Sequence, residues 1–211
     1  MRYPVNYIAI TAPFNKKSHL GVDFGWNSKH GGKNQPIYAV ESGKVIYKKT
    51  QTSGGKVIHI KHDNGYVSEY AHMDTWLVNN GDKVKRGQQI GTMGCTGKVT
   101  GNHLHFGLYK GSKIDYNDDT KWVNPLTYLV KTDDQTVGAT TASKYTIRSA
   151  KYTKKTVIAQ PTLNVRKGPG ILYKKVGSLK YKETVKVYET SGSWSRLDFV
   201  ADEWVSTKYL K

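Results

Sequence analysis

The sequence predicts a mainly β protein, built from antiparallel sheets and divided into two domains. Its 211 residues suffice for one large domain or two small ones. The 21 glycines indicate many turns and few long helices. Short runs of β-branched and aromatic residues recur along the chain, with Gly or Asx-Gly turns between them. This alternation is typical of strands that follow one another through tight turns.

The first half contains four strand-like runs, and glycine turns separate them. The runs cover residues 37–40, 44–47, 56–60 and 65–70. The turns are centred on Gly43, Gly55, Gly65, Gly81 and Gly87. We expect these runs to form a compact antiparallel β-sheet domain over residues 1–130.

A change of composition marks a linker, and strand-like runs resume after it. Residues 131–156 are rich in Thr, Ala, Ser, Asp and Lys and show no apolar period, which is typical of a flexible tether. Five further runs follow, at 163–165, 173–177, 184–188, 194–197 and 203–206. Five short strands predict a small β-barrel over residues 157–211.

The net charge of +17 indicates a polyanionic partner: nucleic acid, an anionic membrane or an anionic wall polymer. The basic excess is spread along the chain, with 17 basic against 9 acidic residues in 1–130 and 10 against 5 in 158–211. A nucleic-acid binder would concentrate it in one stripe, so we expect no nucleic-acid partner. No run approaches the roughly 18 apolar residues of a membrane span, so we expect no membrane insertion.

The start of the chain and its cysteine content bear on localisation. Pro4 and Asn6 interrupt the apolar core that a signal peptide requires. Cys95 is the only cysteine, which excludes an internal disulfide. We therefore expect synthesis in a reducing cytoplasm, without a signal peptide.

The histidines indicate a metal site in the first half, because all seven lie at or before His105. His19 and Asp23 are four residues apart, and the glycines around them favour a strand or loop over a helix. His103 and His105 alternate, so on a strand both point to one face, about 6.5–7 Å apart. His72 lies between the two clusters.

Zinc suits this set of side chains. Imidazole nitrogen and carboxylate oxygen are ordinary zinc ligands, and catalytic zinc keeps three protein ligands and an open position for water. His19, Asp23 and one histidine of the later pair would supply three ligands. The remaining histidines are candidates for the general base and for the donor to an oxyanion.

Residues 10–128 resemble the lysostaphin-like zinc peptidases of bacterial cell walls. Beyond the two histidine clusters, the ordered matches lie at residues 10–14, 70–73, 84–91 and 100–106. The resemblance implies that His19, Asp23 and His105 bind one zinc ion, while His72 and His103 act on the water and the tetrahedral intermediate. Family members commonly carry Glu or Gln where this chain has Gly107. That position is not a ligand, so we expect activity to survive.

Residues 157–211 resemble a bacterial SH3-like domain, through the run from Leu163 to Gly170 and through Trp194 and Trp204. The resemblance implies a module that binds the cell wall. Together the two domains predict a monomeric zinc endopeptidase that hydrolyses stem or cross-bridge peptides of peptidoglycan and contacts anionic wall polymers. Without a visible leader, the chain resembles a phage endolysin, which implies synthesis in the bacterial host cytoplasm and action at the wall after release. The alternative is a non-catalytic wall-binding or activator protein on a degenerate peptidase fold.

Overall fold

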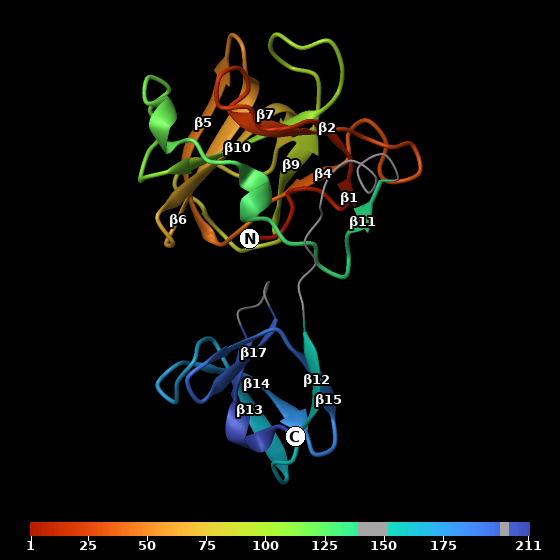
Figure 1. Cartoon of the computed structure of the whole chain (residues 1–211), viewed down its shortest axis with the longest axis vertical. Coiled ribbons are helices and arrows are strands. Elements are labelled where there is room, and N and C mark those ends of the chain that lie inside the picture. The colour runs from red at the N-terminus through yellow and green to blue at the C-terminus, as the bar shows by residue number, and fades with distance from the viewer. Residues whose placement is uncertain (139–151, 199–202) are drawn as a thin grey trace. The chain divides into compact units, whose positions relative to one another are not determined.

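The protein forms two compact units, Met1–Ser149 and Ala150–Lys211, in a computed structural model that describes residues 1–138, 152–198 and 203–211 (Figure 1). The regular secondary structure described in both units consists of β-strands and short 3₁₀ turns. This confirms the predicted mainly β, antiparallel fold class. Within the described ranges, no helix has the length and apolarity needed to cross a bilayer.

The first domain contains β1 to β11. Their bounds are Tyr7–Ile8, Ile10–Ala12, Gly21–Phe24, Pro36–Tyr38, Gly43–Gln51, Gly55–His62, Tyr66–Trp76, Lys83–Val84, Gln89–Met93, Leu104–Lys110 and Thr136–Val137. Two 3₁₀ turns, η1 (Asp119–Lys121) and η2 (Pro125–Thr127), follow β10. The main sheet is antiparallel in the order β2-β3-β10-β7-β6-β5-β8, and β9 pairs with both β4 and β7. β1 and β11 form a separate parallel pair.

The alternation of side chains along the central strands separates a core face from the opposite face of the sheet. On the core face, Phe24 of β3, Phe106 of β10 and Tyr70 of β7 are fully buried and contact one another through Phe106. Burying an aromatic or large aliphatic side chain contributes about 1.5–3 kcal/mol relative to leaving it exposed. Asp23 and His105 belong to the alternate positions, so the same strands that build the core present them on the other face.

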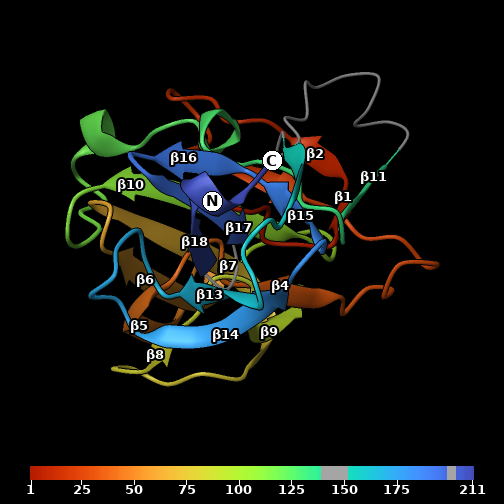
Figure 2. The same cartoon turned by 90° about the horizontal axis from the view of Figure 1, so that it is seen from below.

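The second domain contains β12 to β18. Their bounds are Thr153–Thr156, Thr162–Arg166, Lys175–Lys180, Thr184–Val187, Glu189–Ser191, Trp194–Asp198 and Glu203–Ser206, followed by η3 (Thr207–Tyr209). β12 pairs with β15, and a second sheet has the order β14-β13-β18-β17-β16. Figure 2 shows β13 and β14 side by side in this sheet. Val157, Leu163, Val165 and Val205 form the centre of a small core.

The linker expected over residues 131–156 differs from the structure at both ends. Gln135 is buried, and its amide donates to the carbonyl oxygens of Tyr3 at 2.9 Å and Val5 at 2.7 Å. These bonds and the β1–β11 pairing tie the segment as far as residue 138 to the first domain, while β12 belongs to the second. Composition cannot reveal such pairing with distant backbone. The rest of the expected linker, residues 139–151, lies outside the described residues.

Candidate metal centre

The three residues expected to bind zinc meet on one face of the main sheet, beside the paired strands β3 and β10. Asp23 of β3 and His105 of β10 are directly paired across the two strands. His19 comes from the turn before β3, where Asn15 and His19 exchange backbone hydrogen bonds of 2.8 and 2.7 Å. The side-chain oxygen of Asn15 also accepts from the backbone N–H of Lys17, which stabilises this turn.

The three side chains converge on a common point. Oδ1 of Asp23 lies 3.0 Å from Nε2 of His19 and 2.9 Å from Nδ1 of His105. The two imidazole nitrogens are 3.1 Å apart. Within the described part of the chain, this is the one group of three His, Cys, Asp or Glu residues whose ligand atoms all approach within 4.8 Å.

Gly21 makes the close approach of His105 to β3 possible. A Cβ atom at position 21 would lie 2.5 Å from Nε2 of His105 and 2.7 Å from the carbonyl oxygen of Phe106. Both distances are shorter than any ordinary van der Waals contact. A side chain at this position would therefore displace either the imidazole ring or the strand.

The donor set fits zinc. Ligand atoms at about 2.0–2.2 Å from one tetrahedral ion stand roughly 3.3–3.6 Å apart. The observed separations of 2.9 to 3.1 Å are only slightly shorter, so small side-chain adjustments would admit the ion. Two imidazoles and one carboxylate also match the chemistry that zinc prefers.

The electrostatics of the cluster favour a cation. Burial opposes ionisation of Asp23, but hydrogen bonds with His105 and His19 outweigh it and hold the pKa of the carboxyl well below its usual range. The hydrogen bond with Asp23 in turn raises the pKa of His19, against the opposing effect of burial. The carboxylate therefore stays ionised at neutral pH and attracts positive charge.

His72 and His103 flank this cluster. Their ring centroids are 4.7 Å apart, and the ring of His72 is centred 6.1 Å from that of His105. Nε2 of His103 lies 3.8 Å from Oδ2 of Asp23. The structure thus brings together all five residues that the sequence singles out.

His72 adopts an unusual backbone conformation, with φ of +61°. The left-handed region is uncommon for a residue with a side chain, and such strain concentrates at functional sites. The backbone N–H of His72 donates to the carbonyl oxygen of Gly54 at 2.8 Å. Burial, followed by the neighbouring charges of His103 and His105, lowers the pKa of His72, although its bond to the carbonyl of Thr96 opposes this effect.

Sequence reasoning missed Glu69, a fully buried carboxylate on β7 next to the metal centre. Its Oε1 lies 4.0 Å from Nε2 of His105. Burial raises the pKa of Glu69, but hydrogen bonding to His59 outweighs it and the net pKa is lowered. In the sequence, the sign of its role was a charged residue within a strand. Glu69 lies two residues before Ala71, so both side chains point to the same face of the sheet.

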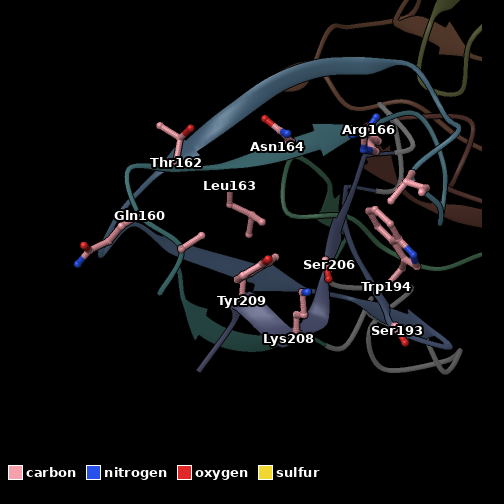
Figure 3. Close-up of a pocket in the computed structure, with 12 residues that line it drawn as sticks. Gln160, Thr162, Leu163, Asn164, Arg166, Ser193, Trp194, Ser206, Lys208 and Tyr209 are labelled. Atoms are coloured by element: carbon pink, nitrogen blue, oxygen red, sulfur yellow. The ribbon is translucent and has the colours of Figure 1, made fainter.

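The second domain contains a pocket of about 560 Å³, lined by β13, η3 and the residues around Trp194. Figure 3 shows Arg166 and Trp194 at one end of it and Gln160 at the other. The lining includes two cationic side chains, Arg166 and Lys208, and no carboxylate among the described residues. Hydroxyl, amide, aromatic and aliphatic groups complete the lining, and the two cations suit a polar or anionic ligand.

Several curated proteins are similar to the first domain. Lipoprotein NlpD of Yersinia enterocolitica is 45% identical over 101 residues, which is 47% of this chain and 94% of that protein. The peptidoglycan DD-endopeptidase ShyB of Vibrio cholerae is 38% identical over 117 residues, 50% of this chain and 26% of that protein. The murein hydrolase activator NlpD of Escherichia coli is 46% identical over 101 residues, 47% of this chain and 24% of that protein. The chain thus spans only about a quarter of the latter two relatives.

Among solved structures, the antimicrobial peptidase lysostaphin from Staphylococcus simulans matches 95% of this chain and 88% of its own, with a TM-score of 0.51 and 23% identity. At this identity the likeness extends to the fold alone.

These names contradict the localisation expected from the sequence. Synthesis in a host cytoplasm without an export signal conflicts with the similarity to a protein named as a lipoprotein. That expectation depended on Pro4 and Asn6 in the first residues. A local interruption of an apolar run carries no information about how the relatives of the folded domain are targeted.

The family models agree with the division into two domains. The model described as a bacterial SH3 domain matches residues 161–211. The model described as peptidase family M23 matches residues 17–125, which include all five residues around the candidate metal centre. The chain therefore belongs to peptidase family M23 and carries a bacterial SH3 domain after the peptidase domain.

Proposed function

We propose that the protein is a zinc-dependent endopeptidase that hydrolyses a peptide bond in the stem or cross-bridge peptides of peptidoglycan. The observation that carries this proposal is the convergence of His19, Asp23 and His105 beside two further histidines. A bound zinc ion would polarise the scissile carbonyl and lower the pKa of a water molecule. Similarity to a DD-endopeptidase of Vibrio cholerae supports the substrate class.

Backbone carbonyls orient the two candidate catalytic histidines. Nδ1 of His72 donates to the carbonyl oxygen of Thr96, and Nδ1 of His103 to that of Gly101, both at 2.9 Å. A carbonyl oxygen only accepts, so each Nδ1 carries a proton and the neutral ring keeps its lone pair on Nε2. Both rings can therefore accept a proton at Nε2.

We assign the general base to His103 and the donor to the oxyanion to His72. Nε2 of His103 faces the carboxylate of Asp23, which would stabilise the imidazolium formed when the ring takes a proton from water. His72 must be protonated to donate, and its lowered pKa makes the proton easy to release to the oxyanion or leaving group. The shared orientation of the two rings is also compatible with the exchanged assignment.

We further propose that the SH3 domain holds the enzyme at its insoluble substrate through the pocket with Arg166, Trp194 and Lys208. Its two cations would attract carboxylates of stem peptides or anionic wall polymers, and Trp194 supplies an apolar surface. Binding to the wall raises the local concentration of the peptidase domain near its substrate. Arg166→Ala should reduce co-sedimentation with purified walls while leaving hydrolysis of a soluble peptide unchanged.

The test of the main proposal is fragment release from purified peptidoglycan. Zinc-loaded protein should release fragments with new peptide termini, identified by mass spectrometry, from walls of known cross-bridge chemistry. The same experiment distinguishes a glycine bridge from a D-alanine cross-link. Release of intact stem peptides without internal cleavage would contradict an endopeptidase.

A second candidate is a non-catalytic activator, because a relative 46% identical over 101 residues is named a murein hydrolase activator. An activator would release no fragments alone but would accelerate a separate murein hydrolase added to the same walls. The intact set of three ligands favours the endopeptidase. The phage endolysin expected from the sequence stays a prediction.

A further inference from the structure

Each histidine around the metal centre has one ring nitrogen that points away from the centre. In His105 this outer nitrogen faces a carboxylate, whereas in His19, His72 and His103 it faces a backbone carbonyl. Nδ1 of His19 donates to the carbonyl oxygen of Pro13 at 2.8 Å, and His72 and His103 have the equivalent bonds described above. His105 directs Nδ1 toward the ligand cluster, which leaves Nε2 on the outer side. The group there is Oε1 of Glu69, at 4.0 Å.

The register of the sheet places Glu69 in this position. Glu69 of β7 is directly opposite Gly107 of β10, and His105 lies two residues before Gly107 on the same face. Glu69 is therefore a diagonal neighbour of His105. A Cβ at position 107 would lie 2.6 Å from the ring of Trp122 and 3.5 Å from Cβ of Glu69. Because Gly107 has no side chain, the carboxylate of Glu69 can occupy this part of the face.

The carboxylate of Glu69 is held from its other side. On β6, His59 is directly opposite Glu69, and its Nε2 lies 2.9 Å from Oε2. The ring of His59 stacks on Tyr47 of β5 with centroids 4.4 Å apart. The hydroxyl of Tyr116 donates to the same Oε2. Both groups bind Oε2, so Oε1 remains directed at His105.

A buried carboxylate is costly unless it is paired, and Glu69 is only 5% exposed. Anchoring the loop around Tyr116 would not require a charge. A hydroxyl or an amide at position 69 could accept from Tyr116 equally well. His59, at 2.9 Å from Oε2, stabilises the charge on one side of the carboxylate, and His105 is the metal-centre residue that Oε1 faces on the other.

We propose that Glu69 is a positioning residue for the metal centre, which keeps the proton of His105 on Nε2 and so presents the Nδ1 lone pair to the ion. This inference rests on the zinc site proposed above. A neutral imidazole has one N–H and one lone pair, so fixing the first fixes the second. Carboxylates that face the outer nitrogen of a metal-binding histidine orient the ring and increase its basicity. At 4.0 Å the pair interacts by charge, and a direct hydrogen bond needs an approach of about 1 Å.

The experiment measures the affinity of the metal-free protein for Zn²⁺ by competition with a chromophoric chelator. Glu69→Gln keeps the shape of the side chain and removes its charge. Loss of an outer carboxylate of this kind costs about 10–100-fold in metal affinity, and we expect a decrease in that range. The visible spectrum of the Co²⁺-substituted protein should change as well, because it reports the geometry of the ligands.

Ser68→Ala is the matched control. Ser68 precedes Glu69 on β7, is fully buried and points to the opposite face, where its hydroxyl lies 2.8 Å from Nε2 of His62. This substitution should lower the melting temperature and leave both zinc affinity and the Co²⁺ spectrum unchanged. A purely structural role of Glu69 would give the same pattern as this control.

Tyr116→Phe provides a second variant in case Glu69→Gln does not fold. Tyr116 is 51% exposed, so loss of its hydroxyl should be tolerated. The substitution removes the hydrogen bond from Tyr116 to Oε2 of Glu69, and we expect a several-fold weaker zinc affinity. If folded Glu69→Gln binds zinc as tightly as the wild type, the role of Glu69 is overturned but the proposed function is not. If Glu69→Gln is unfolded, wild-type zinc affinity in Tyr116→Phe has the same meaning. A wild-type protein that binds no zinc overturns the proposed function and this inference together.

Discussion

His72 and His103 lie side by side with ring centroids 4.7 Å apart, and each donates its Nδ1 proton to a backbone carbonyl. The Nε2 atoms of both rings are therefore the ones left to act beside the candidate metal centre. The two histidines of the His-Leu-His motif therefore have different neighbours: His103, just before β10, lies beside His72, while His105 of β10 contacts Asp23 at 2.9 Å.

The two histidines of this motif should give different losses on substitution. His105→Ala should abolish zinc binding and turnover together, because it removes one of three ligand atoms. His103→Ala should retain most zinc and lower turnover by about 10²–10⁴-fold, the usual contribution of a general acid or base. Metal content by atomic emission and the rate of fragment release distinguish the two. His30→Ala, at an exposed histidine, serves as the control. Equal zinc loss in both histidine variants would refute the assignment.

Metal removal should separate catalysis from wall binding. Chelation should stop fragment release, and stoichiometric zinc should restore it, because the ion would supply the polarisation of the carbonyl and the activation of water. Co-sedimentation with walls should persist in the metal-free protein, since the described residues that line the pocket around Trp194 include no histidine or carboxylate. Fragment release that continues in demonstrably metal-free protein would exclude the proposed chemistry.

Gly21→Ala should damage the metal centre without touching a ligand. The new Cβ would lie 2.5 Å from Nε2 of His105, so the ring or the strand must move. Overpacking of this kind costs typically about 1–3 kcal/mol, and zinc affinity should fall with the melting temperature. Gly101→Ala is the control, because a Cβ there meets nothing within 4 Å. Unchanged zinc affinity in Gly21→Ala would mean that His105 occupies another position in solution.

His62 should make stability depend on pH. Its Nδ1 lies 2.9 Å from the carbonyl oxygen of Ser42 and its Nε2 lies 2.8 Å from the hydroxyl of Ser68. Burial lowers the pKa of His62 below the ordinary value of 6.5, although the Ser42 carbonyl opposes this shift. The unfolded chain therefore binds a proton more readily than the folded one.

The contribution of His62 is fully present above pH 6.5 and is lost as the pH falls from that value toward the lower pKa of the folded state. Melting temperatures measured from pH 8 to pH 5 should decline less in His62→Gln than in the wild type. Parallel curves for the two proteins would contradict a depressed pKa.

The sequence contained enough information to single out the five residues that the structure brings together at the candidate metal centre, because their residue types suit zinc binding or proton transfer. It also predicted strands at 56–60 and 65–70, which the structure extends to β6 and β7. It failed at the linker, where Gln135 bonds to backbone more than 120 residues away. Pairings between distant segments leave little trace in local composition.

By itself, then, the sequence determined the β fold class. It also predicted a zinc site, and its resemblance to a peptidase family implied which residues bind the metal and which act on water. Only the tertiary structure decided which ring nitrogen of each histidine faces the centre, since that depends on carbonyls of Pro13, Thr96 and Gly101. It also revealed Glu69, whose relation to His105 is set by the register of β7 against β10. Strand register is a property of paired backbones, and side chains that are diagonal neighbours across a sheet are far apart in the chain.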